Sequence, residues 1–113
     1  MAPTAAQKMY ERQIDFLRTK DVDGLIESHY HKDAVLISFG SIVQGHEQLK
    51  EHFRSYLAAL GTIEVESTDR FTATENAIFF EATVSSNMGR ARVYDAWTLR
   101  DGRIAQHFTG VMP

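Results

Sequence analysis

The chain has 113 residues, of which 43% are hydrophobic and 24% are charged, with a formal charge of -3 at pH 7. This length predicts a single domain, 1–113, and the lack of cysteine excludes disulfides, zinc–thiolate sites and thiol nucleophiles. The basic residues are scattered, so neither nucleic acid nor an anionic membrane is an expected partner. Since no apolar run could span a membrane and the N-terminus lacks the pattern of a secretory signal, a cytoplasmic location is expected.

The N-terminal half of the chain predicts three helices and one strand. Thr4 and Gln7 fit a capping box at the start of the first amphipathic helix, and Gly61 suits the end of the third. The strand is an apolar, β-branched run, and the short stretch 41–44 either continues it or pairs with it. The predicted elements are a helix over 4–20, a helix over 21–30, a turn over 31–33, a strand over 34–39 and a helix over 45–60.

From residue 62 onward the apolar period changes from helical to two, which predicts antiparallel strands. Residues 67–70 suit a bulge in the first of these strands. The expected strands cover 62–74, 77–86, 90–100 and 103–112. Helices followed by such a meander indicate an α+β fold with the helices on one face of the sheet. A bent, covered sheet leaves a conical space between the layers, and small-molecule pockets occur in such apolar concave spaces.

One carboxylate interrupts the apolar face of the strand 90–100. Period-two alternation places Asp95 on the same face as Val93, Trp97 and Leu99. Burial of an ionised carboxylate without a partner costs several kcal/mol, so Asp95 needs a partner, a proton or a wet cavity. Asp95 is therefore either the acid–base group of a pocket or a buried acid with a structural partner.

The loop between the last two strands decides whether His107 contacts Asp95. A three-residue loop, 100–102, sets Asp95 opposite His107 and pairs an acid with a base in a manner suited to proton transfer. A two-residue turn at Asp101-Gly102 sets Asp95 opposite Phe108 instead, and His107 then points away. Both loops suit the sequence.

The sequence contains four other histidines, at positions 29, 31, 46 and 52. His29 and His31 either reach the mouth of the cavity or lie at a solvated helix end, where a cationic imidazole suits the helix dipole. His46 and His52 lie six residues apart on the third helix and do not share a face, so both are expected on the surface. No histidine spacing points two rings into one cavity, and no metal site is expected.

Three segments carry a resemblance to a known family: HYHKDAVL at 29–36, GHEQLKEHF at 45–53 and VYDAWTLRDGRI at 93–104. Together with the element order, they resemble the SnoaL-like and ketosteroid isomerase-like branch of the nuclear transport factor 2-like superfamily. The resemblance implies a cystatin-like cone, in which three N-terminal helices pack on a strongly bent antiparallel sheet. It also favours the loop that pairs Asp95 with His107.

The resemblance implies a role for Asp95. It falls where ketosteroid isomerase has the acid that donates a hydrogen bond to the developing oxyanion, and it suits the base of SnoaL-like polyketide cyclases. The isomerase's base aspartate is matched here by Ser38, and its oxyanion tyrosine by Gln13 or Ile14. Steroid isomerisation by the standard set of residues is therefore not expected.

Two functions are expected for such a protein. The first is a cofactor-free isomerase, cyclase or lyase in which Asp95, helped by His107, moves a proton on a hydrophobic carbonyl substrate. The second is a non-catalytic ligand-binding or dimeric interaction module. The expected substrate-binding residues are Tyr10, Ile14, His29, Tyr30, Ser38, Phe53, Phe80 and Trp97.

A homodimer is expected through the sheet face opposite Asp95, because that face mixes aromatic residues and arginines as protein interfaces do. The residues expected on it are Phe79, Arg92, Tyr94, Ala96, Thr98, Ile104 and Phe108.

Overall fold

The computed structural model describes residues 4–113. The expectation about a secretory signal rests partly on residues 1–3, which lie outside this range. The helices are α1 (Ala5–Thr19), α2 (Val22–His29) and α3 (Gly45–Leu60). The strands are β1 (Tyr30–Ser38), β2 (Ser41–Gln44), β3 (Glu64–Ala73), β4 (Ala77–Ser86), β5 (Gly89–Arg100) and β6 (Arg103–Val111).

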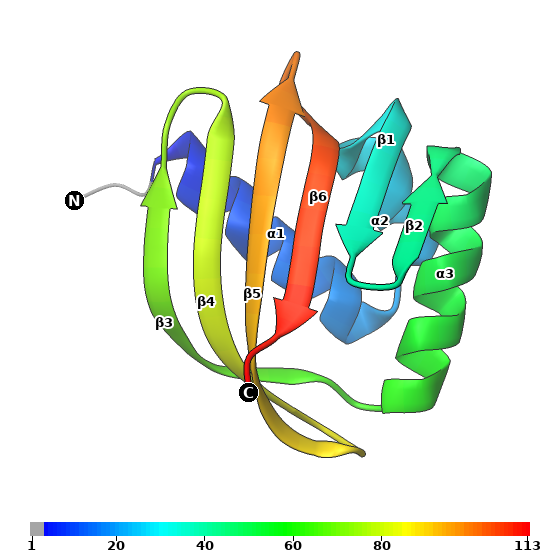
Figure 1. Cartoon of the computed structure of the whole chain (residues 1–113), viewed down its shortest axis with the longest axis vertical. Helices are drawn as coiled ribbons and strands as arrows, with labels where there is room; N and C mark the ends of the chain where they lie inside the picture. Colours follow the sequence, from blue (N-terminus) through cyan, green and yellow to red (C-terminus); the bar gives the residue numbers. More distant parts are fainter. Residues whose placement is uncertain (1–3) are drawn as a thin grey trace.

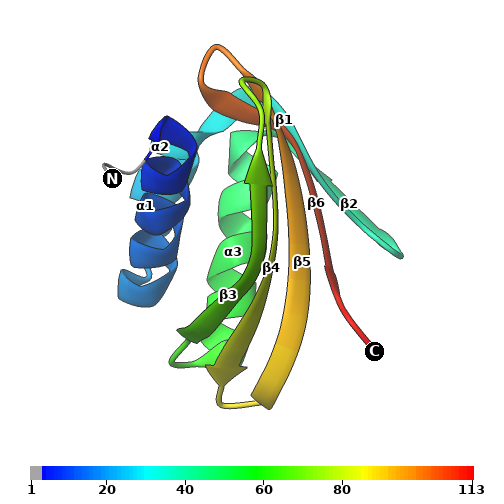
Figure 2. The same ribbon diagram turned by 90° about the vertical axis from the view of Figure 1, so that its left-hand side faces the viewer.

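The strands form one curved sheet, and the helices cover one face of it (Figures 1 and 2). The strand order is β2-β1-β6-β5-β4-β3, in which β3 to β6 form the predicted antiparallel meander. The sheet is mixed rather than wholly antiparallel, because the last strand of the meander returns beside β1 and runs parallel to it. This α+β arrangement, with helices on one side of a bent sheet, is the expected fold class.

Local sequence signals set the helix ends as predicted. The capping box is present, since the Thr4 hydroxyl accepts from the Gln7 amide at 3.1 Å and the Gln7 side chain accepts from the Thr4 amide at 2.9 Å. The Asp21 side chain caps α2 by accepting from the Gly24 amide at 3.0 Å. Gly61 ends α3 with a φ of 67°, a conformation that glycine adopts without steric cost.

The first strand differs from its predicted bounds. β1 begins at Tyr30, so the expected turn at 31–33 is already part of the strand. The backbone of Tyr30 pairs with Ile104 of β6, and both side chains are fully buried, so tertiary pairing overrides the polar local sequence. The stretch 41–44 is a separate strand, β2, which pairs antiparallel with β1.

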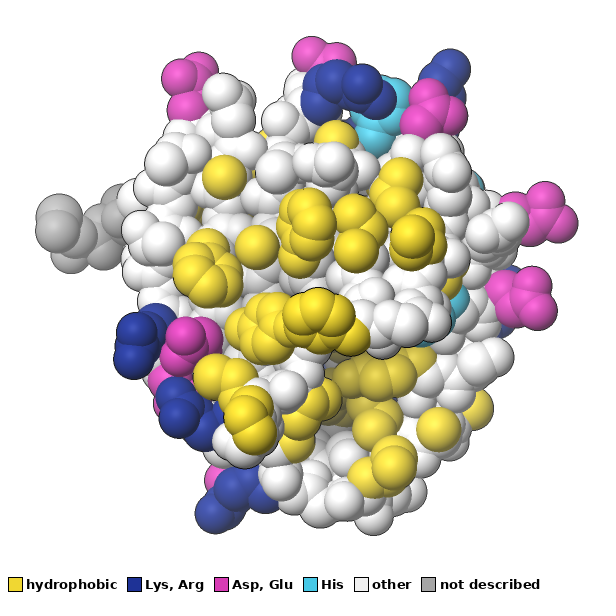
Figure 3. Space-filling view, viewed as in Figure 1, with side chains coloured by type: hydrophobic (Ala, Val, Ile, Leu, Met, Phe, Trp, Pro, Cys, Tyr) yellow, Lys and Arg dark blue, Asp and Glu magenta, His cyan; other side chains and the backbone are white. Residues whose placement is uncertain are grey.

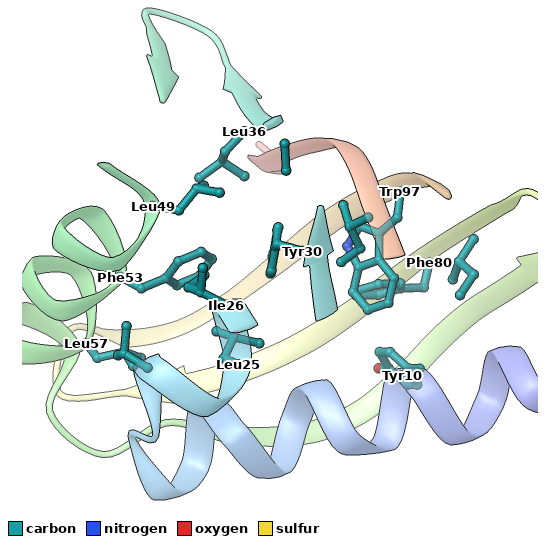
Figure 4. Close-up of a cluster of buried hydrophobic side chains, with 14 of the residues drawn as sticks. Tyr10, Leu25, Ile26, Tyr30, Leu36, Leu49, Phe53, Leu57, Phe80 and Trp97 are labelled. Carbon is teal, nitrogen blue, oxygen red and sulfur yellow. The ribbon is translucent and has the colours of Figure 1, made fainter. Parts of the chain in front are cut away.

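The core lies between the helices and the inner face of the sheet (Figure 4). Tyr10 of α1 packs against Phe80 at a ring separation of 4.5 Å, and Phe80 meets Trp97 edge to face at 5.4 Å. Ile104 belongs to this core, which corrects its expected place on the outer face. The turn explains this position. Because Arg100 pairs with Arg103, Ile104 pairs with Leu99, and both side chains point to the inner face of the sheet.

The edge strand β3 is bulged twice, within and next to the predicted segment 67–70. Its register against β4 shifts between Val65 and Ser67 and again between Thr68 and Arg70. Each shift leaves one carboxylate residue, first Glu66 and then Asp69, without an opposite residue on β4.

Candidate functional site

A cavity of about 270 Å³ lies between the inner face of the sheet and helices α1 and α3. Most of its wall is apolar, and Asp95 is the single carboxylate among the described lining residues. No lysine or arginine is among the lining residues within 4–113. The polar side chains on the wall are Tyr10, Gln13, Ser38, His52, Tyr56, Asp95, His107 and Thr109. A mostly apolar wall with a few convergent polar groups is typical of a small-molecule site.

Asp95 and His107 are in contact on this wall. The Nε2 atom of His107 lies 2.6 Å from Oδ1 of Asp95, and the two side chains are only 6% and 14% exposed. This distance is that of a strong, charge-assisted hydrogen bond. The other carboxylate oxygen of Asp95, Oδ2, has no hydrogen-bond partner among residues 4–113 and is available to a ligand.

The contact between Asp95 and His107 depends on a register of β5 against β6 that neither of the two predicted loops gives. The turn is the two-residue one, since Arg100 pairs with Arg103, and Asp101 and Gly102 both have positive φ. A β-bulge then shifts the register beyond Leu99, so that His107 pairs with Trp97 and Asp95 pairs with Thr109. Because Asp95 and Trp97 share the inner face, His107 also points inward and reaches Asp95 diagonally.

A chain of buried hydrogen bonds continues from His107 into the helices. The Nδ1 atom of His107 lies 2.8 Å from the Tyr30 hydroxyl, which also accepts from Nε2 of Gln13 at 3.1 Å. The Oε1 atom of Gln13 lies 2.8 Å from Nδ1 of His29. Asp95, His107, Tyr30, Gln13 and His29 therefore form one continuous polar network that crosses the apolar core.

One set of proton positions satisfies every bond in this network. If His29 donates to Gln13 and Gln13 donates to Tyr30, the Tyr30 hydroxyl has its proton left to donate to Nδ1 of His107. His107 is then a neutral imidazole whose Nε2–H donates to the Asp95 carboxylate. Tyr30 thus fixes the tautomer of His107 that faces Asp95.

Six of the expected substrate-binding residues line the cavity, namely Tyr10, Ile14, Ser38, Phe53, Phe80 and Trp97. The other two, His29 and Tyr30, do not line it, which corrects their expected position. Both are buried behind the wall because their side chains complete the network with Gln13 and His107. Gln13, which the sequence offered only as a replacement for a tyrosine, lines the cavity and connects the two layers.

The sequence reasoning missed two cavity-lining residues of α3, His52 and Tyr56, and placed a third residue, His46, on the surface. His52, expected on the surface, lines the cavity together with Tyr56, and their rings stack at 6.2 Å with an interplanar angle of 6°. His46, also expected on the surface, is half-buried and its Nε2 lies 2.8 Å from the Tyr30 carbonyl oxygen. The usable signal for His52 is its spacing, three residues after the buried Leu49, which places it beside the apolar stripe.

Burial shifts the pKa values of the titratable groups around the cavity. Burial raises the pKa of the Tyr10 and Tyr56 phenols, and the charge of Asp95 raises both further. Burial also raises the pKa of Tyr30 strongly. Burial lowers the pKa of His29 to about 4, with a smaller contribution from the charge of Arg12. Tyr10, Tyr30, Tyr56 and His29 are therefore all uncharged at neutral pH.

The fold and the cavity agree with a family assignment. The SnoaL-like domain family matches residues 10–107, and the chain therefore belongs to this family. No curated protein matches the sequence. Among the residues described, no helix is long and apolar enough to cross a bilayer.

Solved structures share the fold at low sequence identity. TerC co-crystallised with polyporic acid is 17% identical, with 96% of this chain and 92% of that chain covered and a TM-score of 0.79. A candidate polyketide cyclase of Sinorhizobium meliloti is 22% identical over 91% and 94% of the two chains, with a TM-score of 0.79. A nuclear transport factor 2-like protein of Anabaena variabilis is 20% identical over 100% and 95%, with a TM-score of 0.77.

Proposed function

We propose that this protein is a cofactor-free isomerase, cyclase or lyase that moves a proton on a hydrophobic carbonyl substrate. The observation that carries the proposal is the Asp95 carboxylate on the wall of an apolar cavity, held at 2.6 Å by a buried imidazole. A base so oriented, with one oxygen left for the substrate, suits proton abstraction next to a carbonyl group. The family and the candidate polyketide cyclase among the similar structures support a role with small molecules.

The charged groups on the cavity wall limit the class of substrate that the cavity can bind. Asp95 is the one carboxylate there, and no lysine or arginine among the described lining residues would offset the charge of an anionic ligand. A carboxylate or phosphate on the ligand would be desolvated beside a like charge, which is unfavourable. We therefore propose an uncharged, apolar carbonyl compound as the substrate.

Hydrogen–deuterium exchange tests this function without knowledge of the natural substrate. The probe is 2-tetralone, an uncharged bicyclic ketone, incubated with the protein in D₂O while exchange next to its carbonyl is followed by NMR. We expect the wild type to accelerate exchange and Asp95→Asn to lose about 10²-fold or more of that acceleration. The matched control is Asp33→Asn, a change at an exposed carboxylate of β1, which should exchange at the wild-type rate.

Two results would contradict the proposal. Wild-type protein that leaves the exchange rate unchanged would favour the non-catalytic binding module. A folded Asp95→Asn variant with full activity would remove Asp95 from the reaction.

We also propose that the protein is a homodimer through the outer face of the sheet. The Cα pairings place Phe79, Ala96, Phe108, Ile37 and Ile42 side by side across five strands. Phe79, Phe108 and Ile42 are 47%, 38% and 72% exposed. Figure 3 shows hydrophobic side chains gathered across the middle of this face, with charged groups toward its margins. Large exposed apolar patches with a polar rim are typical of interaction surfaces.

A further inference from the structure

We infer that His52 is a second proton-transfer residue of the cavity, which serves the carbonyl oxygen of the substrate while Asp95 serves the adjacent carbon. The inference rests on the proposed function and adds a catalytic group from the helical wall to the one from the sheet. Two observations support it: His52 lies on the cavity wall, and the other four imidazoles are already hydrogen-bonded to protein groups.

His107 has no ring nitrogen left to bind a substrate. Its Nε2 is bonded to Asp95 and its Nδ1 is bonded to Tyr30. Asp95 itself offers a single oxygen, Oδ2. Removal of a proton from carbon by that oxygen leaves negative charge on the carbonyl oxygen, and a second group is needed to donate a proton there.

His52 has the contacts that such a group requires. The other four imidazoles of the chain each hydrogen-bond to a protein group: His29, His31, His46 and His107. Among residues 4–113, the His52 ring has no hydrogen-bond partner, and it faces the cavity. The Tyr56 ring lies parallel to it, and the Phe53 ring meets it edge to face at 5.5 Å.

The surroundings of His52 keep its imidazole neutral. Burial lowers its pKa, and the neighbouring His107 lowers it further. The titratable groups that share the cavity with it are Tyr10 on α1, Tyr56 on α3, Asp95 on β5 and His107 on β6. A neutral imidazole carries one N–H donor and one acceptor nitrogen, so it can give a proton to an oxygen and later take it back.

The resulting step balances. The bond between the α-carbon and its hydrogen breaks, and the proton passes to Oδ2 of Asp95. The electron pair left on carbon forms a carbon–carbon double bond, and the π pair of the carbonyl group moves to its oxygen. That oxygen takes the proton from the His52 N–H, so the negative charge passes from Asp95 to the His52 ring, which becomes an imidazolate. Asp95 then returns a proton to the same or to a different carbon, while the enol O–H returns its proton to His52, so that both residues are regenerated. Return to a different carbon gives isomerisation, and replacement of the proton on Asp95 by a deuteron from D₂O before its return gives exchange.

The variant His52→Gln tests the inference with the same 2-tetralone assay. We expect exchange to fall by roughly 10²-fold. The matched control is His31→Gln. Because His31 lies outside the cavity lining, this variant should exchange at the wild-type rate.

The variant Tyr56→Phe tests whether the neighbouring phenol, instead of His52, donates the proton. Loss of exchange in Tyr56→Phe with a wild-type rate in His52→Gln would assign the role to Tyr56 and overturn the inference.

Ligand binding separates failure of this inference from failure of the proposed function. We expect the wild type to bind 2-naphthol, an enol-like alcohol, more tightly than naphthalene, and His52→Gln to lose that preference while it still binds naphthalene. If Asp95→Asn loses exchange and His52→Gln does not, the proposed function stands and the inference fails. If the wild type neither binds the two compounds nor exchanges 2-tetralone, both fail.

A measurement on the unmodified protein covers the case in which the variant does not fold. Binding of 2-naphthol to the wild type should shift the ¹⁵N resonances of the His52 ring in NMR spectra, whereas naphthalene should not. Bound 2-naphthol with unshifted His52 nitrogens would overturn the inference.

Discussion

The His107 imidazole bonds to Asp95 although the two residues do not face each other across the hairpin. His107 pairs with Trp97 and Asp95 pairs with Thr109, so the 2.6 Å contact is a diagonal one. The bulge beyond Leu99 makes this diagonal available, because a regular ladder from the same turn would point His107 to the outer face. One extra residue in β6 therefore determines whether the cavity contains this acid–base pair.

Loss of the imidazole should destabilise the protein. His107→Asn leaves Asp95 without its partner in an apolar wall and Tyr30 without its acceptor, so we expect the free energy of unfolding to fall by about 2–4 kcal/mol. Urea denaturation followed by circular dichroism measures this change. The control His31→Asn, at the exposed contact with Arg100, should lower the free energy of unfolding by less than about 1 kcal/mol. Equal costs for the two variants would contradict the network.

The hydroxyl of Tyr30 should matter for stability and for the state of His107. Tyr30→Phe deletes one buried hydroxyl group that accepts from Gln13 and donates to His107. We expect the free energy of unfolding to fall by about 1–3 kcal/mol. Tyr94→Phe provides the matched control, since its hydroxyl belongs to no bond of this network. The ¹⁵N resonance of Nδ1 in His107 should change in Tyr30→Phe only. An unchanged resonance would show that Tyr30 does not donate to His107.

The stability of the protein should fall between about pH 6.5 and pH 4. His29 has a pKa of about 4 in the folded chain and an ordinary value near 6.5 when unfolded, so in this window the unfolded chain binds the extra proton. The contribution of His29 to the free energy of unfolding is fully present above pH 6.5 and is lost as the pH falls, by about 3 kcal/mol in total. Denaturant midpoints measured at several pH values should show this slope, and His29→Gln should flatten it. A wild-type slope in His29→Gln would assign the effect to other groups.

The apolar row formed by Phe79, Ala96, Phe108, Ile37 and Ile42 on the outer face of the sheet is the proposed dimer interface. A charge in the middle of this row should separate the dimer. Phe108 lies at the centre of the row, between Ala96 and Ile37, so Phe108→Glu would bury a carboxylate against the partner's apolar surface. We expect sedimentation velocity to show a dimer for the wild type and a monomer for this variant. Met88→Glu, at an exposed apolar residue in the β4–β5 turn, should remain dimeric. A monomeric wild type at micromolar concentration would contradict the proposed dimer.

Much of the fold could be predicted because its signals are local. The capping box at Thr4, the glycine that ends α3 and the change of period after residue 61 each act over a few residues, and all three appear in the structure. The start of β1 could not be predicted, because Tyr30 follows directly on a helix and is extended only through its pairing with Ile104. Such a long-range contact leaves no local pattern.

The site was predictable in part for a related reason. Alternation along β5 identified Asp95 and Trp97 as inward residues, and the cavity contains both. The bulge in β6 was not predictable, since Ala105 and its neighbours carry no glycine or proline that would mark it. The inward position of His52 was missed because a histidine beside an apolar stripe reads equally well as a surface residue.

The two bulges of β3 have a consequence for the behaviour of the protein at high concentration. This strand is one outer edge of the sheet, where a free row of backbone N–H and C=O groups could accept a strand from another molecule. The ladder there is interrupted at Glu66 and Asp69, and both carboxylates stand at the interruptions. An incoming strand would meet an irregular spacing together with two ion pairs, Glu66 with Arg90 and Asp69 with Arg92, so growth into fibrils by strand addition is disfavoured at this edge.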